Sequence, residues 1–394
     1  MCEWKEYQLS DVAEIVGGGT PKTKESDYWN GEIAWLTPRD LSNFNGRYIS
    51  KGERNISKLG LAKSSAKILP KGAVLLSSRA PVGYLAIAKN EITTNQGFRS
   101  LIPNSKTNNL FLFYLLKNKV EYLKSQSTGT TFGELAGSTL KSLSFLFPFL
   151  PEQRAIASAL SSLDDKIDLL HRQNKTLEAM AETLFRQWFI EEADEGWEED
   201  SLLELIQLVG GGTPKTSILD YWDGDIPWLA GGDITTNHKS FVNYAEKRIT
   251  EAGLNNSSAK LLPKYGTVIS ARGTVGKYCI LAEPMAFSQS NYGILPNIKN
   301  SFFFTYLLIN HVVEELQSSA YGSVFDTITT TTFKENNVPI PTETEIVQFE
   351  KLISPYFQKM FMNKYQIGTL EKLRDTLLPK LMNGEVRVEM EASL

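Results

Sequence analysis

Apolar residues recur at alternating steps of four and three along two long segments of the chain. The first segment, residues 151–193, has them at Ile156, Leu160, Leu163, Ile167, Leu170, Leu177, Ala181, Leu184 and Trp188. The second, residues 343–394, has them at Phe349, Ile353, Tyr356, Met360, Ile367, Leu370 and Leu377. This spacing predicts two long helices, each with a heptad seam. At about 1.5 Å per residue, roughly 40 residues make a helix about 60 Å long.

One polar residue interrupts each seam, Asn174 in the first and Asn363 in the second. A heptad face left in water would waste its apolar area, so we expect the two helices to pair within the chain as an antiparallel coiled coil. In that pairing Asn174 and Asn363 are expected to fix the register rather than to add stability. The alternative is two separate helices, each packed on its own domain.

The two seams belong to a repeat that covers nearly the whole chain. Residues 17–40 read GGGTPKTKESDYWNGEIAWLTPRD and residues 210–233 read GGGTPKTSILDYWDGDIPWLAGGD, so Thr213 repeats Thr20 at an offset of 193 residues. A unit of this length is too long for a stacked solenoid and matches a domain plus a connecting element.

Short apolar runs bounded by Gly and Pro, such as AVLLSS and GYLAIA, predict strands, and FLFYLLKNKVEYLKSQ predicts a helix. The expected fold is therefore α+β. Two tandem mixed domains, at 1–150 and 194–342, are separated by the helices at 151–193 and 343–394. The expected arrangement is pseudo-two-fold.

Composition is that of a globular protein: 42% of the 394 residues are hydrophobic and 22% are charged, enough apolar mass for two cores. The start, MCEWKEYQLS, lacks the pattern of a signal peptide, and no apolar run is long enough to span a bilayer. We therefore expect a cytoplasmic protein without a membrane partner. Two cysteines, Cys2 and Cys279, and three scattered histidines predict neither a disulfide framework nor a metal site.

Charge is distributed unevenly although the net charge is only −4. Residues 1–150 contain 19 Lys and Arg against 12 Asp and Glu, whereas residues 151–200 contain 5 against 13. The first block is basic enough to lie beside a polyanion such as DNA. The second globular block has no such surplus, which argues against tight DNA binding by this chain alone.

No motif for catalysis or for a cofactor is found in the sequence. The GGGTPKT loop resembles a phosphate-binding loop superficially, but Pro21 and Pro214 stand where that loop needs a glycine N–H. There is no GxGxxG, no Asn/Asp-Pro-Pro-aromatic tetrapeptide, no nucleophile elbow and no paired-carboxylate motif. We expect a chain that is not an enzyme by itself and holds no cofactor.

Four strings carry a resemblance to a known family: GGGTPKTKESDYWNGEIAWLTPRDL, LLSSRAPVGYLAIAKNEITTNQGF, PEQRAIASALSSLDDKIDLL and LEKLRDTLLPKLMNGEV. They span the chain, and the sequence resembles the specificity subunit of Type I restriction-modification systems. The resemblance implies two target recognition domains that read a split double-stranded DNA target, with an antiparallel coiled coil as the ruler between its halves. It also implies two docked adenine methyltransferase subunits that bind S-adenosylmethionine, and restriction subunits that can join them.

Comparison of the two repeats sorts the candidate DNA-binding residues. Side chains shared by both copies suit phosphate contact, loop architecture or a common base contact; they are Thr20 and Thr213, Lys22 and Lys215, Arg79 and Arg272, and Gln96 and Gln289. Side chains that differ inside shared frames are candidates for base readout; they are Thr37, Arg39, Asn95 and Arg99 in the first copy and Ser288 and Asn291 in the second. Neutral surface drift is the alternative for the second group.

The aromatic residues beside the GGGTP loop allow two interpretations. Tyr28, Trp29 and Trp35, with Tyr221, Trp222 and Trp228 in the second copy, could stack on extruded bases. More often, an aromatic cluster beside a Gly-Pro loop clamps the loop on the core, and we favour that interpretation.

Three function classes follow from these observations. The leading hypothesis is a non-catalytic DNA-recognition subunit of a methyltransferase and restriction complex. The second is a stand-alone coiled-coil DNA-binding regulator, which the weak charge balance disfavours. The third is a fused single-chain modification enzyme, which the missing catalytic motifs disfavour.

Overall fold

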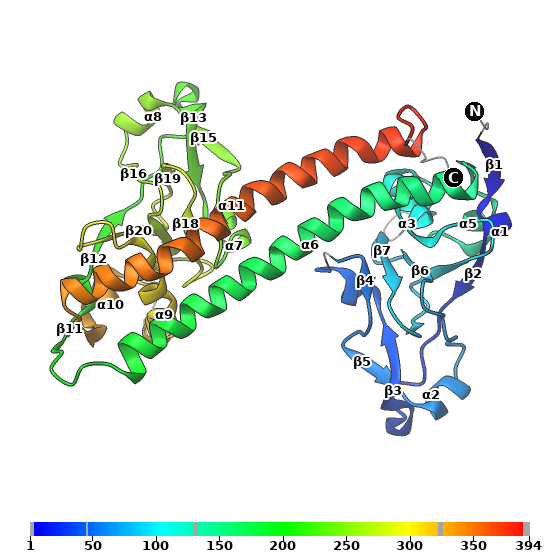
Figure 1. The fold of residues 1–394 in the computed structure, drawn as a ribbon, viewed down its shortest axis with the longest axis horizontal. Helices are drawn as coiled ribbons and strands as arrows, with labels where there is room; N and C mark the ends of the chain where they lie inside the picture. The colour runs from blue at the N-terminus through cyan, green and yellow to red at the C-terminus, as the bar shows by residue number, and fades with distance from the viewer. Residues whose placement is uncertain (1–3, 45, 129–132, 322–325, 389–394) are drawn as a thin grey trace, which may run out of the picture. The chain divides into compact units, whose positions relative to one another are not determined.

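The computed structural model describes residues 4–44, 46–128, 133–321 and 326–388 (Figure 1). The chain divides into two compact units: unit 1 is residues 1–169 with 368–394, and unit 2 is residues 170–367. Each unit contains one α+β domain and the adjoining ends of both long helices, which confirms the predicted fold class. Within the described part of the chain, no helix is long and apolar enough to cross a membrane.

Unit 1 contains three small sheets. The largest has the order β2 (Ala13–Gly17), β9 (Arg99–Pro103), β6 (Val74–Ser78), β7 (Val82–Ala88) and β4 (Tyr48–Ile49). The second has the order β5 (Arg54–Ile56), β3 (Trp29–Leu36) and β8 (Thr93–Thr94), and the third pairs β1 (Lys5–Gln8) with β10 (Ser144–Phe147). The short helices are α1 (Leu9–Val12), α2 (Lys58–Ala62), α3 (Asn109–Asn118), α4 (Val120–Ser125) and α5 (Gly137–Ser142), with 3-10 turns at Ser26–Tyr28 and Pro38–Leu41.

Unit 2 repeats this topology. Its largest sheet has the order β12 (Ile206–Gly210), β20 (Asn291–Pro296), β17 (Thr267–Ser270), β18 (Tyr278–Leu281) and β14 (Phe241–Val242). The second has the order β15 (Lys247–Ile249), β13 (Trp222–Leu229), β19 (Met285–Phe287) and β16 (Leu261–Leu262), and β11 (Glu199–Ser201) pairs with β21 (Asn337–Pro339). Its short helices are α7 (Gly231–Thr236), α8 (Glu251–Asn255), α9 (Phe302–Tyr321) and α10 (Thr330–Glu335), with 3-10 turns at Leu202–Glu204 and Leu219–Tyr221.

The helix that covers the large sheet differs between the units. In unit 2 it is the single helix α9, whereas in unit 1 it breaks at Lys119, where the backbone leaves the helical region (φ −105°, ψ 12°). In both units the helix packs its apolar residues into the main core; Phe111 to Leu116 are all buried in unit 1. The single helix predicted over FLFYLLKNKVEYLKSQ is therefore two helices, α3 and α4, in unit 1.

The two long helices, α6 (Leu150–Arg186) and α11 (Glu343–Met382), pair in antiparallel orientation within each unit (Figure 1). In unit 2, Asn363 Nδ2 donates to Asn174 Oδ1 at 2.7 Å, and the rings of Phe185 and Phe349 lie 5.9 Å apart. Increasing residue numbers on one helix therefore meet decreasing numbers on the other. The coiled coil is confirmed, and the alternative of two separate helices is wrong. That the two asparagines fix the register stays a prediction.

A buried ionic network in unit 1 joins the domain to both helices. Asp164 on α6 accepts a hydrogen bond from the Tyr114 hydroxyl of α3 at 2.6 Å and one from Arg374 Nη1 of α11 at 2.9 Å. Arg47, which is only 6% exposed, lies 3.9 Å from Asp164 and forms an ion pair with Asp165. Burial, together with the Asp164 carboxylate, raises the pKa of Tyr114 well above its ordinary value, so the phenol stays protonated and donates.

The corresponding position in unit 2 is apolar. Phe357 occupies the position of Asp164 in the repeat, and its ring stacks on Phe303 at 4.5 Å with an interplanar angle of 9°. Unit 1 therefore fastens its domain to the helices with charges, and unit 2 uses aromatic packing.

Removing the carboxylate of Asp164 leaves the Tyr114 hydroxyl buried without its acceptor and takes one of two carboxylates from the buried Arg47. We expect Asp164→Ala to lower the free energy of unfolding by about 3–5 kcal/mol, measured by denaturant unfolding of the full chain. Glu121→Gln is the control, because Glu121 is 87% exposed and pairs with Lys124 at the surface of unit 1, so its loss should cost less than ~1 kcal/mol. Equal effects of the two substitutions would contradict a network held by burial.

Unit 2 should become less stable as pH rises because of Glu350. Its carboxyl accepts from the backbone N–H groups of Phe303 and Phe304 at the start of α9, yet burial raises its pKa from 4.5 to about 7. A carboxyl whose pKa is raised by folding contributes its stability below pH 4.5 and loses it as pH rises through about 7. The free energy of unfolding should therefore fall as pH rises from 5 to 8. Glu350→Gln should reduce this pH dependence by on the order of 2 kcal/mol over that range.

The measurement is denaturant unfolding across that pH range, with Glu343→Gln at the exposed start of α11 as the control. A slope that Glu350→Gln leaves unchanged, or one that reverses sign, would show that Glu350 is not its source.

Candidate functional site

In unit 1, four loops from distant parts of the sequence come together. Gly19 N donates to Thr94 O at 2.8 Å, and Asn95 N donates to Leu36 O at 2.8 Å. Ser78 N donates to Gly97 O at 2.7 Å, which adds the turn between β6 and β7. The candidate residues Thr20, Thr37, Arg79 and Asn95 to Arg99 therefore lie in one loop cluster.

The glycines that both copies of the GGGTP loop share are explained by close backbone packing. A Cβ on Gly18 would lie 2.1 Å from Asn95 O, and one on Gly19 would lie 2.4 Å from Ala66 N. In unit 2, a Cβ on Gly211 would lie 2.1 Å from Ser288 O and one on Gly212 would lie 2.2 Å from Ala259 N. Only glycine fits at these positions, and the loop serves as a structural joint in both units.

Tryptophans clamp this loop, as the favoured interpretation of the aromatic residues predicts. Trp35 Nε1 donates to Gly19 O at 2.9 Å from a buried ring, and Trp29 packs edge-on against Trp35 at 5.0 Å. In unit 2, Trp228 Nε1 donates to Gly212 O at 2.9 Å, and Trp222 lies 5.3 Å from Trp228. Because Trp35 and Trp228 are buried and hydrogen-bonded, these two rings are not available to stack on extruded bases.

Three charged side chains meet at the edge of the cluster in unit 1. Arg99 Nη2 pairs with Glu134 Oε1 at 3.2 Å, and its Nη1 donates to the carbonyls of Phe98 at 3.0 Å and Gln96 at 3.3 Å. Arg99 is thus occupied with holding the loop, and its side chain is 22% exposed. The Arg79 side chain is 39% exposed, and its Nη1 lies 3.9 Å from Glu134 Oε2.

Unit 2 presents different side chains on the same framework. Arg272, the copy of Arg79, is exposed, and Tyr292 stands in place of Arg99 and packs against Phe333 at 5.9 Å. Gly232 stands in place of Arg39, and a Cβ added there would meet no atom within 4 Å. The loop that carries an exposed arginine in unit 1 is therefore bare in unit 2.

Two of the candidate base-reading residues are buried. Ser288 is 8% exposed and Asn291 is 1% exposed, and Asn291 Nδ2 donates to Ser288 Oγ at 2.8 Å. These side chains hold the turn between β19 and β20 together from within. In unit 1, Asn95 Oδ1 does comparable work by accepting from Gly97 N at 2.8 Å, and Thr37 Oγ1 donates to Asp40 at 2.8 Å. The sequence pattern did not separate such loop-building residues from surface residues.

The remaining candidates lie at the surface of the clusters. Lys22, Arg39 and Gln96 are exposed in unit 1, as are Lys215 and Gln289 in unit 2, and Thr20 and Thr213 are half-buried. Thr20 Oγ1 donates to the side-chain oxygen of Gln96, so these two act together. Each unit thus offers cations and amide groups from neighbouring loops, the side chains that bind phosphates and base edges.

The outer face of the helix pair in unit 2 carries a groove of about 740 Å³ that sequence analysis did not find. Ala179, Met180 and Leu184 of α6 and Tyr356 of α11 line it, with Arg172 and Lys175 toward the start of the groove. Met180 is 44% exposed, and Leu373, its copy in the repeat, is 44% exposed in unit 1. Leu184 and Tyr356 are seam positions, whereas Ala179 and Met180 lie outside the heptad pattern, which therefore did not predict the groove.

Comparison with known proteins agrees with the repeat and the architecture. Residues 1–179 and 194–370 match the sequence profile of the Type I restriction modification DNA specificity domain. The Type I restriction enzyme MjaIX specificity subunit of Methanocaldococcus jannaschii is 35% identical over 98% of this chain and 94% of its own length. The HindI specificity subunit of Haemophilus influenzae is 24% identical over 98% of this chain and all of its own. The crystal structure of a Type I restriction-modification S subunit from M. genitalium superposes with a TM-score of 0.65, at 17% identity over 96% of each chain.

Proposed function

The chain belongs to the family of Type I restriction-modification specificity subunits, and from this premise we propose that it reads a split, asymmetric target on double-stranded DNA and docks adenine methyltransferase subunits there. The loop cluster of each unit reads one half of the target, and the paired helices set the spacing between the halves. The chain contributes recognition and positioning. The methyltransferase subunits bind S-adenosylmethionine and supply the chemistry.

This proposal rests on one observation: the two units share the same loop backbone, but the side chains that this backbone exposes differ between them. Both units have the tryptophan-clamped glycine loop, whereas Arg39 faces solvent in unit 1 and Gly232 leaves the same loop bare in unit 2. A shared framework suits a common docking geometry on the duplex, and unequal side chains suit two different half-sites. Arg79 and Arg272 are the shared exposed cations beside these loops, and an arginine suits phosphate or guanine.

The charge distribution of the chain supports DNA recognition that depends on the methyltransferase subunits. The net charge of −4, with the acid concentrated in residues 151–200, leaves little electrostatic attraction for DNA outside the basic first block. Tight binding to a duplex therefore needs further cations, which methyltransferase subunits would bring. The same balance disfavours the stand-alone DNA-binding regulator, the alternative function.

The outer face of the helix pair supports methyltransferase docking. The groove beside Met180 and Tyr356 is apolar along its floor and suits an amphipathic helix of a partner. Leu373 repeats the exposed apolar position of Met180 in unit 1, so the sequence offers two equivalent positions for two methyltransferase subunits. Restriction subunits would join through the methyltransferases, in the cytoplasm where the DNA lies.

Mixing the purified chain with the methyltransferase of the same system should produce tritium transfer from S-adenosylmethionine to adenine in a split motif. Arg79→Ala and Arg272→Ala should each lower the rate at limiting DNA by about tenfold, because a lost charged contact costs about 1–3 kcal/mol. Lys106→Ala and Lys299→Ala are matched controls. Both lysines are exposed and follow the C-terminal ends of β9 and β20, whereas the loop clusters lie at the N-terminal ends of these strands.

Each outcome of this experiment separates the hypotheses. Sequence-specific transfer only in the mixture supports the proposal. Transfer by the chain alone would make it a single-chain enzyme, and tight specific binding without methyltransferase would make it a regulator.

Charged substitutions on the helix pair should reduce the number of methyltransferase subunits bound. A glutamate in the groove must lose its hydration when an apolar helix covers it, so Met180→Glu and Leu373→Glu should each remove one of two bound subunits and the double variant should remove both. The mass of the complex by light scattering measures this, with Glu343→Gln as the control. An unchanged mass for the double variant would show that docking occurs elsewhere.

A further inference from the structure

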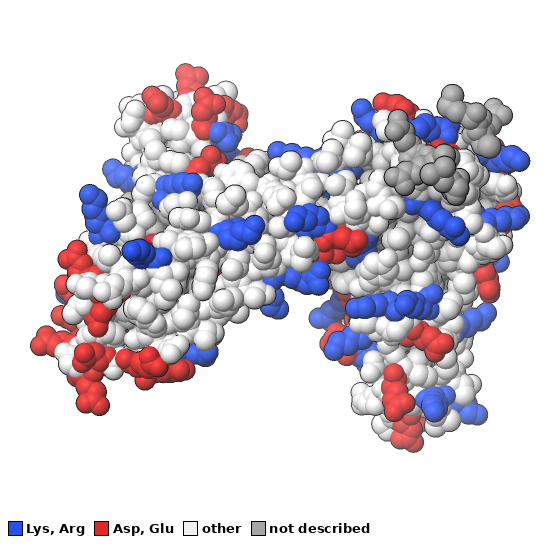
Figure 2. All heavy atoms as spheres, viewed as in Figure 1, with Lys and Arg blue, Asp and Glu red and all other residues white. Residues whose placement is uncertain are grey.

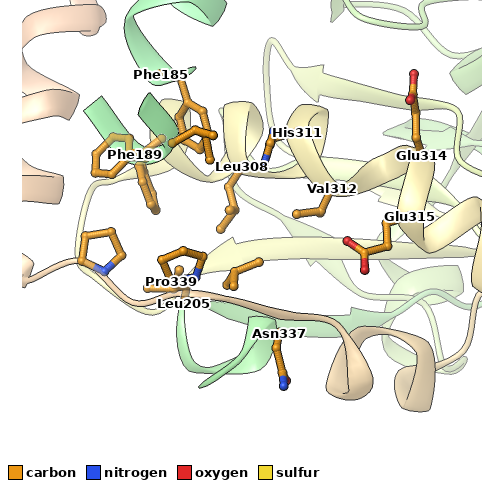
Figure 3. A pocket seen from close by; sticks show the side chains of 14 residues that line it. Phe185, Phe189, Leu205, Leu308, His311, Val312, Glu314, Glu315, Asn337 and Pro339 are labelled. Carbon is orange, nitrogen blue, oxygen red and sulfur yellow. The ribbon is translucent and has the colours of Figure 1, made fainter. Parts of the chain in front are cut away.

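A cavity of about 260 Å³ opens in unit 2 where the end of α6 meets α9 and β21 (Figure 3). Phe185 and Phe189 lie at one end of it and Glu315 at the other, with Leu308 and Val312 between them (Figure 3). All of these except Glu315 are nearly inaccessible to solvent. The turn that directly follows α6, Gln187–Glu191, is π-helical, a distortion that occurs often at functional sites.

The repeat shows why the cavity exists in unit 2. The equivalent positions in unit 1 carry Tyr122 in place of Glu315 and Phe145 in place of Val338. The rings of Phe145 and of Tyr122, which is 45% exposed, pack edge-on at 6.1 Å and occupy that position in unit 1. In unit 2 the two rings are replaced by a carboxylate and a smaller aliphatic side chain, and their volume stays empty.

The size of the cavity limits what it can hold. An apolar cavity of about 150 Å³ is enough for benzene. At about 260 Å³, this one accommodates a single aromatic ring or a branched aliphatic side chain, with the walls of Phe185, Phe189 and Leu308 around it.

Negative charge surrounds the opening. Glu314 and Glu315 are exposed at the cavity, and the loop that follows α6, residues 191–200, has seven acidic residues and no lysine or arginine. Figure 2 shows Asp and Glu side chains gathered around that end of unit 2. This field repels nucleic-acid phosphates and favours a cationic partner. It also differs from the groove on the helix pair, which has Arg172 and Lys175 beside it.

We propose that this cavity anchors a protein partner through one large apolar side chain, aromatic or leucine-like, that is flanked by lysine or arginine. The apolar side chain fills the space that Tyr122 and Phe145 fill in unit 1, and the flanking cations pair with Glu314, Glu315 and the acidic loop. A buried aromatic anchor with a charged rim is a common form of interaction hot spot. The site is separate from the loop clusters and does not depend on the proposed DNA reading.

Fluorescence anisotropy of labelled peptides, with the full chain at low ionic strength, tests this proposal. The probes are Lys-Lys-Phe-Lys-Lys, Lys-Lys-Ala-Lys-Lys and Glu-Glu-Phe-Glu-Glu. The first should bind at least ~10-fold more tightly than either of the others, because it alone combines the anchor with the cations.

Two variants locate the binding. Glu315→Tyr with Val338→Phe copies the residues of unit 1 into the cavity, and should abolish binding while leaving the thermal midpoint of unfolding equal or higher. Glu314→Gln with Glu315→Gln should weaken Lys-Lys-Phe-Lys-Lys by about tenfold without touching the core, with Glu121→Gln, the copy of Glu314 in unit 1, as the matched control.

Three results would each overturn the proposal. The first is undiminished binding to the variant with Glu315→Tyr and Val338→Phe, here called the filled variant; the second is equal binding of Lys-Lys-Phe-Lys-Lys and Glu-Glu-Phe-Glu-Glu; the third is no binding of Lys-Lys-Phe-Lys-Lys up to millimolar concentration. Tight binding of single-stranded DNA at the same site, lost in the filled variant, would also overturn it and identify a nucleic-acid site instead.

Discussion

The antiparallel pairing of α6 and α11 is the constraint on which each unit depends. In unit 1 the pair is fastened at Asp164, which receives Tyr114 from the domain and Arg374 from the opposite helix. In unit 2, Asn363 of α11 donates to Asn174 of α6, and Phe357 of α11 stacks on Phe303 of the domain. The helix that covers each large sheet, α3 or α9, packs directly on these contacts. Each loop cluster is therefore held in a defined position on the helices of its own unit.

Duplication followed by divergence explains how one framework serves unequal tasks. The glycines and tryptophans that join the loops are the same in both units, because a side chain on Gly18 or Gly211 would collide with the backbone. The side chains of the two copies differ at positions where an added side chain would meet no neighbouring atom, as at Arg39 and Gly232. Elsewhere divergence changes the interior: an ion pair of Arg99 in one copy is an aromatic contact of Tyr292 in the other.

The sequence predicted the features that repeat or that follow a period. It contained the duplicated domains, the strands and the helix seams, because these depend on hydrophobic spacing that any single copy shows. It could not predict that Asp164 is buried beside a seam, since a charged residue on a helix is normally solvated and only its meeting with Arg47 and Arg374 stabilises it there.

Three-dimensional contacts were also needed to sort the candidate site. Ser288 and Asn291 are polar and variable, which is typical of surface residues, yet they build a turn from inside it. Glu134 was missed because nothing in its local sequence indicates that Arg79 and Arg99 meet it. The cavity of unit 2 was missed because its lining comes from the end of α6, from α9 and from β21, which are far apart in the sequence.

The central claim is that each domain reads its own half of a split DNA target. The most direct measurement is genome-wide mapping of N6-methyladenine in cells whose chain carries residues 194–342 in place of residues 1–150, so that both domains are the same. The account predicts that the asymmetric motif of the natural chain is replaced by a symmetric one, built from two inverted copies of a single half-site. An unchanged asymmetric motif would contradict it.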